Sequence, residues 1–200
     1  MKNPKKIILL ASAMLASVIV QAQAFDDGKN IFALGFGFPA TSTIQNNFDL
    51  SKDFVDYKFK NYGTGVFKYE HGLAKYFGVG FDFDYSAASV SYKYGSNTNQ
   101  LYQVNDASKL LGFYARLNGH FPIGDRFDLY GGVGLGYGYQ INNKSDSNPS
   151  TISSSQKSTV LNFDYQLTLG ARYMIKDHFG FFCEVGIANT TAQAGIAFGF

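Results

Sequence analysis

The chain has 200 residues, of which 16% are charged and 17% aromatic, with 22 glycines and a formal net charge of +2. No apolar run after residue 24 approaches the ~18 residues that a membrane helix needs, which excludes a membrane protein built of long apolar helices. The single cysteine, Cys183, excludes an internal disulfide and a cysteine-based metal cluster. One compositional zone predicts one domain, and many aromatics with few charges favour a membrane protein built of strands.

Residues 1–24 have the pattern of a secretory signal peptide, which implies Sec-dependent export. A basic start precedes the apolar run Ile7–Val20, and small residues allow cleavage after Ala24 or, as an alternative, after Ala22. The basic start holds Lys2, Lys5 and Lys6. Removing these three of the 17 basic residues leaves 14 against 15 acidic ones, a net charge of −1. A nucleic-acid partner therefore has no electrostatic basis, and we expect the folded domain to be residues 25–200.

Eight segments alternate large apolar residues with small or polar ones, the pattern of β-strands with two different faces. The clearest is Phe77–Tyr85, where Phe and Tyr alternate with Gly and Asp. The eight predicted strands are Ile31–Phe38, Tyr62–Glu70, Phe77–Tyr85, Leu111–Phe121, Leu129–Ile141, Val160–Ile175, Phe179–Ile187 and Ala192–Phe200.

The connections alternate between short and long, as in an outer-membrane barrel with tight periplasmic turns and long outside loops. The short ones are His71–Tyr76, Pro122–Arg126 and Lys176–His178, and the long polar ones are Pro39–Asn61, Ala87–Lys109 and Asn142–Thr159. We therefore predict an all-β fold, an eight-stranded antiparallel up-and-down transmembrane β-barrel with both termini in the periplasm. Serines make the last long loop low in complexity.

A soluble eight-stranded barrel of the lipocalin type is the competing fold, because it also closes the sheet and removes exposed edges. Its outer surface would have to be charged. The polar faces of this chain instead carry much glycine, such as Gly132, Gly134 and Gly136, and few charges. Glycines suit the interior of a narrow barrel, where side chains from other strands need room. The chain also lacks the tryptophan usual in the first lipocalin strand.

Several motifs resemble the small outer-membrane β-barrel proteins of the opacity-protein-like, porin-like superfamily. They are Lys68–Leu73, Leu129–Tyr137, Phe179–Gly186 and the C-terminal Gly195–Phe200. The resemblance implies an eight-stranded barrel in the outer membrane of a Gram-negative-type bacterium, in contact with outer-membrane lipid and lipopolysaccharide. Ile196, Phe198 and the terminal Phe200 look like the signal read by the barrel-assembly machinery, with periplasmic chaperones as earlier partners.

Seven charged residues should point into the lumen, as judged by their alternation with the apolar residues of each strand. They are Lys68, Glu70, Asp82, Asp84, Arg116, Arg172 and Glu184. One hypothesis is a plug, in which ion pairs satisfy buried charges in a packed interior. The other is a charged constriction or gate in a pore. An eight-stranded lumen is usually filled by side chains, which favours the plug.

Three functions are consistent with this fold, because fold does not fix function. The first is a non-enzymatic barrel with surface loops for recognition, adhesion or envelope shielding; its first two loops are rich in aromatics, which could also pack on each other. These aromatics are Phe48, Phe54, Tyr57, Phe59, Tyr92, Tyr94 and Tyr102. The second is a narrow porin-like channel for small solutes or ions.

The third is a lipid A-modifying enzyme, which needs a histidine near the outer leaflet. His71 and His178 instead fall in periplasmic turns, and His120 is one residue from such a turn. No pattern in the sequence indicates a cofactor or a metal site, and we predict no catalytic residue.

Overall fold

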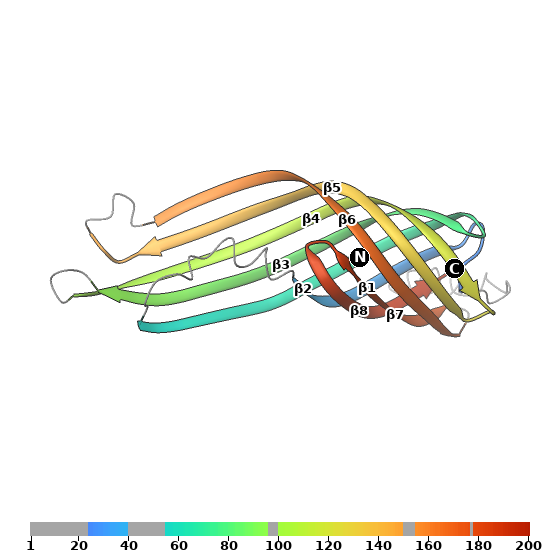
Figure 1. The fold of residues 1–200 in the computed structure, drawn as a ribbon, viewed down its shortest axis with the longest axis horizontal. Helices are drawn as coiled ribbons and strands as arrows, with labels where there is room; N and C mark the ends of the chain where they lie inside the picture. The colour runs from blue at the N-terminus through green and yellow to red at the C-terminus, as the bar shows by residue number, and fades with distance from the viewer. Residues whose placement is uncertain (1–23, 40–54, 96–99, 150–154, 177) are drawn as a thin grey trace, which may run out of the picture.

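A computed structural model describes residues 24–39, 55–95, 100–149, 155–176 and 178–200. These residues form eight strands and no helix (Figure 1). The strands are β1 (Asn30–Pro39), β2 (Val55–Ala74), β3 (Phe77–Gly95), β4 (Leu101–Ile123), β5 (Phe127–Asp146), β6 (Ser155–Lys176), β7 (Phe179–Ile187) and β8 (Thr190–Gly199). The described residues include no helix long and apolar enough to cross a membrane. The predicted signal peptide lies almost wholly in residues 1–23, outside the described residues.

The strands form a closed barrel in sequence order, and β1 pairs with β8 to close it. Every neighbouring pair is antiparallel, and the closing pair runs in register from Ile31 opposite Gly199 to Phe38 opposite Ala192. The predicted eight-stranded up-and-down barrel is confirmed. Closure leaves no unpaired edge in this part of the sheet, so every strand there has a backbone partner on both sides.

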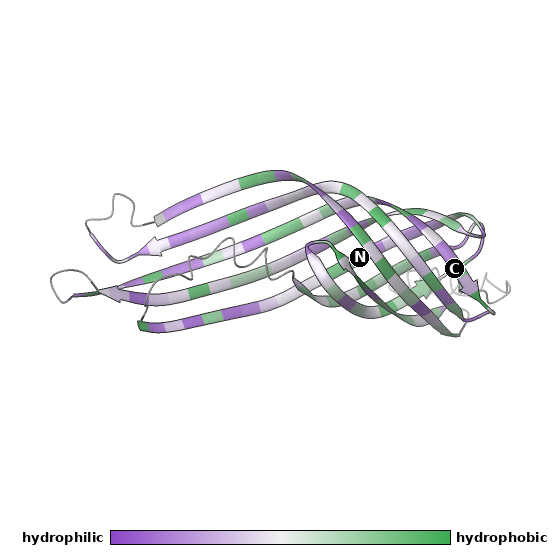
Figure 2. Ribbon diagram, viewed as in Figure 1, coloured by the Kyte–Doolittle hydropathy of each residue, from purple (hydrophilic) through white to green (hydrophobic). Residues whose placement is uncertain are grey.

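The alternation of the sequence becomes an apolar outside and a polar inside. On β3, the outward Phe77 is 56% exposed, whereas the inward Asp82 is 2% exposed. Most of the other exposed large side chains on the barrel wall, such as Leu135 and Leu169, are also apolar or aromatic. Figure 2 shows this banding, with hydrophobic and hydrophilic residues alternating along the crossed strands. The outside of the barrel is therefore a lipid-facing surface, as in membrane barrels.

The strands differ greatly in length, and this corrects the predicted long loops. β1, β7 and β8 have 10, 9 and 10 residues, whereas β2 to β6 have 19 to 23. Much of what the sequence indicated as loop is strand, because β2 to β6 continue past the closed barrel as one five-stranded sheet (Figure 1). We call this sheet the extension. It comprises residues 55–63, 87–95, 101–109, 141–146 and 155–159.

A β-bulge marks the point at which β2 leaves β1. The register of β2 against β3 shifts between Asn61 and Thr64, and Thr64 is the last β2 residue paired with β1. Gly63 has a φ of 75°, and a Cβ there would lie 2.0 Å from the Phe36 ring. Only glycine fits this backbone and this contact. The Gly63 amide donates to the Asn61 side chain at 2.8 Å, which satisfies the bulged backbone.

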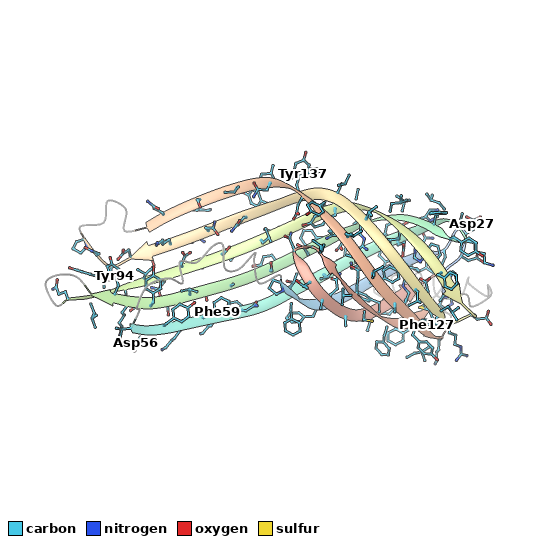
Figure 3. All side chains as sticks on the ribbon, viewed as in Figure 1. Asp27, Asp56, Phe59, Tyr94, Phe127 and Tyr137 are labelled. Atoms are coloured by element: carbon cyan, nitrogen blue, oxygen red, sulfur yellow. The ribbon has the colours of Figure 1, made fainter. Side chains whose placement is uncertain are left out.

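Two short connections are tighter than predicted. β2 and β3 are joined by Lys75 and Tyr76 alone, and β4 and β5 by residues 124–126. Figure 3 shows the two ends of the molecule: Asp27 and Phe127 lie at the short-turn end, and Asp56 and Tyr94 lie at the tip of the extension.

Candidate functional site

Four of the predicted lumen charges form one cluster in the middle of the barrel. Arg116 Nη1 lies 3.0 Å from carboxylate oxygens of both Asp82 and Glu184. Lys68 Nζ lies 2.8 Å from the same Asp82 oxygen and 2.7 Å from Glu184. Two cations thus face two anions. Thr168 Oγ1 accepts a hydrogen bond from Arg116, and Gln193 donates one to Glu184. Charges in the barrel interior are tolerated when they are paired and hydrogen-bonded.

The sequence places this cluster by register. Lys68 on β2 lies directly opposite Asp82 on β3, so their side chains share the inner face. Arg116 has a glycine on each side, Gly80 on β3 and Gly134 on β5. With no side chain beside it, the guanidinium can reach across the lumen to Glu184 on β7.

A second cluster lies nearer the short turns and contains Glu70 and Arg172. Arg172 Nη2 lies 2.8 Å from Glu70, and its Nη1 lies 3.5 Å from Asp128. His120 sits between the same two carboxylates, with Nε2 2.8 Å from Glu70 and Nδ1 2.9 Å from Asp128. Both ring nitrogens face carboxylate oxygens, an arrangement that the doubly protonated imidazolium satisfies. Asn118 also donates to Glu70.

Phe25 closes the lumen at the short-turn end. Its side chain is fully buried, and its ring stacks on His120 with centroids 3.5 Å apart and planes 6° from parallel. The stack covers the second charge cluster. Gly72 allows the segment that carries Phe25 to approach β2 closely, because a Cβ on residue 72 would lie 2.2 Å from the Asp26 carbonyl oxygen.

Asp84 differs from the other six predicted lumen charges. It is buried, but among the described residues it forms no ion pair, so the expected pairing with Arg or Lys was wrong for this residue. The side chains around Asp84 in the barrel interior are instead neutral or acidic. Tyr114 Oη donates to Asp164 at 2.8 Å, and Asn189 donates to Tyr114. The cations lie one layer closer to the short turns.

The lumen around the charge clusters has almost no free space. The cavity lined by Lys68, Glu70, Arg116 and Glu184 has a volume of about 20 Å³. A water molecule needs roughly 10–15 Å³ of such space, so the cavity holds one at most. Glycine contributes to this packing: a Cβ on Gly170 would lie 2.3 Å from the buried Tyr130 ring. Side chains fill this narrow interior, as expected for eight strands.

Sequence reasoning missed several members of the second cluster. His120 is predicted one residue from a periplasmic turn and is not among the seven predicted lumen charges, and Asp128 falls just outside the predicted strand Leu129–Ile141. Both lie in strands that extend to Ile123 and from Phe127. The alternation Arg116, Asn118, His120 along β4 was the available signal, since it continues the inner face to the last turn.

All three histidines lie at the short-turn end, as their sequence positions indicated. His71 contacts Asn30, and His178 contacts the Gly199 carbonyl oxygen at 2.8 Å. His120 is enclosed in the lumen. Within the described part of the chain, no group of three or more His, Cys, Asp or Glu side chains is arranged to hold a metal ion.

The extension has two faces of different chemistry. The inner face continues the lumen and buries Val90 and Val104, and Tyr94 and Tyr102 contact each other there at 5.8 Å between ring centroids. Of the aromatics singled out in the sequence, Phe48 and Phe54 lie outside the described residues. The outer face carries small polar side chains and lysines. In Figure 2 the extension, on the left, is accordingly rich in hydrophilic residues.

Two carboxylates of the extension have shifted pKa values. Asp56 accepts a hydrogen bond from Lys93 at 2.6 Å, and this contact lowers its pKa. Asp56 also has a left-handed φ of 57°, a conformation that Asp tolerates better than most residues. Burial raises the pKa of Asp106, and the charge of Lys144 partly offsets that rise. Asp106 and Lys144 are paired residues of β4 and β5.

Of the three residues proposed as an assembly signal, Ile196 and Phe198 lie on the outward side of β8, and Phe200 directly follows its last residue. Phe198 and Phe200 are exposed, and the Phe200 ring stacks on Phe32 with centroids 5.5 Å apart. Ile196 lies opposite Leu34 of β1. The backbone of Phe200 exchanges hydrogen bonds with Asn30, so the last residue completes the closing strand pair.

Comparison with known proteins agrees with this geometry. The model of the outer membrane protein beta-barrel domain matches residues 8–197. The chain belongs to this family. The fold class and the family expected from the sequence motifs are both confirmed, and the protein is an outer-membrane β-barrel protein. No curated protein matches the sequence.

One solved structure shares the fold, and a second has a lower similarity score. Ail, the attachment invasion locus protein of Yersinia pestis, crystallised with the heparin analogue sucrose octasulfate, has a TM-score of 0.51 and 13% identity over 87% of this chain and 99% of its own. OprG of Pseudomonas aeruginosa has a TM-score of 0.43 and 13% identity over 90% of this chain and 99% of its own. At this identity the likeness to Ail shows the fold alone.

Proposed function

We propose that this outer-membrane barrel is non-enzymatic and that its extension recognises a partner outside the cell. The observation that carries the proposal is the five-stranded extension, which continues β2 to β6 well beyond the closed barrel. In bacterial outer-membrane barrels the short turns face the periplasm and the longer connections face outside. The extension then stands on the outer surface, on a rigid scaffold of the kind that usually carries recognition.

The packed lumen supports a plug over a channel. Arg116 and Lys68 span the interior between strands, and the cavity beside them has a volume of only about 20 Å³, too small for a solute to pass. Phe25 and His120 close the periplasmic end. In this proposal the lumen charges hold the wall of the barrel together and carry no solute.

The edges of the extension offer a route to recognition through the backbone. Residues 55–63 of β2 have no described strand beside them on the β1 side, and residues 155–166 of β6 have none on the β7 side. An extended peptide can add to such an edge by main-chain hydrogen bonds. Ail, which has the same fold, was crystallised with a heparin analogue, so a sulfated glycan is a second class of ligand to test.

The position of the histidines supports a non-enzymatic role. His71, His120 and His178 all lie at the periplasmic end, away from the outer leaflet where a lipid A-modifying enzyme would act. In the same proposal, Sec export follows the signal peptide of residues 1–24, and the assembly machinery reads Ile196, Phe198 and Phe200.

Two measurements test the proposal. Planar-bilayer recordings of the purified protein should show no steady unitary conductance; a conductance changed by Arg116→Ala or Asp82→Ala would establish the channel instead. Cells displaying the chain should adhere to immobilised heparin or to an immobilised library of extended peptides, the two ligand classes named above.

The control for adhesion is a trimmed variant in which residues 90–106 are replaced by Asn-Gly. Ser89 and Ala107 are directly opposite each other, so a tight turn can join them. This variant should fold and lose adhesion. Equal adhesion by both proteins would contradict recognition through the extension.

A further inference from the structure

The outer face of the extension contains a polar groove. Its volume is about 470 Å³, and its walls come from β2, β3, β4 and β5. Two rows of side chains form its floor, as the strand register shows. One row runs from Lys60 through Ser89 to Asn143, and the next from Lys58 through Ser91 to Ser145. Directly opposed residues share a face of a sheet, so both rows point outward.

This face is strongly basic. Lys58, Lys60, Lys109 and Lys157 are all exposed. By register Lys109 lies opposite Ala87, and Lys157 lies opposite Asn143, on the same outward face. Among the described residues, no carboxylate forms an ion pair with any of these four lysines. Asp106 and Lys144 lie between the two rows along their strands, so their side chains point to the inner face. The groove is therefore rich in cations. Two carboxylates lie close to it: Asp56 interacts with Lys58 but is paired with Lys93, and Asp106, which also lines the groove, lies opposite Lys144.

The distance of the groove from the lipid-facing band determines which layer of the outer membrane it contacts. Tyr85, Leu111 and Tyr139 form the last large apolar row that faces lipid, and Lys109 follows two residues beyond Leu111. Each two-residue step along a strand rises ~7 Å. The two rows of the groove thus lie ~10–20 Å beyond the lipid-facing band. Their side chains point along the membrane plane, as the lipid-facing ones do, into the saccharide layer of the outer leaflet.

The chemistry of the floor suits sugars better than protein. Serine hydroxyls and asparagine amides can hydrogen-bond sugar hydroxyls, and lysines attract phosphate groups. Protein interfaces are instead anchored by aromatic side chains in their centre. The one large aromatic here, Tyr62, stands at the rim and is 59% exposed. A ring in that position can pack against the apolar face of a sugar.

We propose that this groove binds the phosphorylated core oligosaccharide of lipopolysaccharide in the same membrane, with Lys58 and Lys60 contacting the phosphates. The proposal rests on the outward orientation given to the extension above. It deepens that function by assigning one face to the surrounding glycolipid, which leaves the inner face, the edges and the tip for an outside partner.

The test measures binding of deacylated, phosphorylated lipopolysaccharide core to the full chain in nanodiscs of neutral phospholipid. The wild type should bind the phosphorylated core, and binding should fall with rising salt. Lys58→Gln with Lys60→Gln should weaken it roughly twenty-fivefold, because each lysine near an anionic surface contributes ~1 kcal/mol, which is about a fivefold change. Lys75→Gln, which removes one exposed cation in the periplasmic turn, should leave it unchanged.

Three outcomes would overturn the proposal. They are binding of the phosphatase-treated core as tightly as the intact core, an unchanged affinity in the double variant, and binding of heparin but not of the core through the same lysines. The last result would assign the groove to the outside partner, so the adhesion function would stand while this inference fails. A heat-modifiable gel shift confirms that each variant is folded.

Discussion

The closed barrel and the extension share five strands but are held together differently. In the barrel each strand has two partners, and the interior carries the buried Arg116, Asp82 and Glu184 together with the partly buried Lys68. In the extension, the described residues include no strand beside the outer edges of β2 and β6, and the ion pair of Lys93 with Asp56 there is exposed. The same backbone pattern thus serves two environments. We therefore expect most of the stability to come from the barrel, and we expect changes in the extension not to unfold it.

The largest expected effect is from breaking the central charge cluster. Arg116→Met leaves Asp82 and Glu184 with only Lys68, and removing one partner of a buried ion pair typically costs about 3–5 kcal/mol. We expect a loss of that size in the free energy of unfolding, measured by urea titration in phospholipid vesicles. Arg116→Met combined with Glu184→Gln should lose less, because the uncompensated charge is gone. Equal losses would show that the cluster is not coupled.

The second-largest effect should come from overpacking against the buried Tyr130 ring. Gly170→Ala places a Cβ 2.3 Å from this buried ring, and overpacking of this kind costs about 1–3 kcal/mol. Gly119→Ala is the matched control, since a Cβ there meets nothing within 4 Å. The same urea titration compares the two. A destabilisation by Gly119→Ala as large as that by Gly170→Ala would mean that loss of glycine itself, and not the lumen, is responsible.

Deletion of Phe200 should act on assembly more than on stability. The residue ends the closing strand, and its backbone pairs with Asn30. We expect a several-fold drop in heat-modifiable protein in the outer membrane, measured by gel mobility of membrane fractions. The Phe200→Tyr variant keeps an aromatic ring there and should assemble normally. Normal assembly of the deletion would remove our assignment of the terminal signal.

The smallest effects should come from the extension. Lys93→Gln removes an exposed ion pair with Asp56, and such pairs contribute little in water. Its unfolding midpoint in urea should match that of the wild type. The pKa of Asp56 is lowered in the folded protein, so the pair persists at neutral pH and is lost only under strong acid, as the carboxylate protonates. A clear shift at neutral pH would show that the extension contributes to barrel stability.

The barrel could be predicted from the sequence because every strand of the wall has one face toward lipid and one toward the lumen, so apolar and polar residues alternate along it. Phe77 and Phe83 face lipid and Asp82 faces the lumen, as their spacing indicates. The extension was missed because both of its faces are partly polar. Ser89, Val90, Ser91 and Tyr92 alternate, but the contrast in hydropathy is weak there. Polar composition was therefore read as loop.

The individual contacts of the lumen could not be predicted from one sequence. Spacing along a strand gives the face of a residue, but the stagger between strands decides which charges meet. Glu70 and Arg172 are 102 residues apart and come from β2 and β6, which are not neighbours. Asp84 shares the face of Asp82 yet lies one layer away from the cations. Tertiary register, and not residue type, separates the two carboxylates.

The continuity of β2 to β6 has a mechanical consequence. A pull on the tip of the extension, near Asp56 and Tyr94 (Figure 3), loads five strands along their own axes. The hydrogen bonds between those strands are then sheared together, because each lies across the direction of force. A tethered hairpin would instead unzip one bond at a time. An attachment made at this tip is therefore anchored by most of the barrel wall.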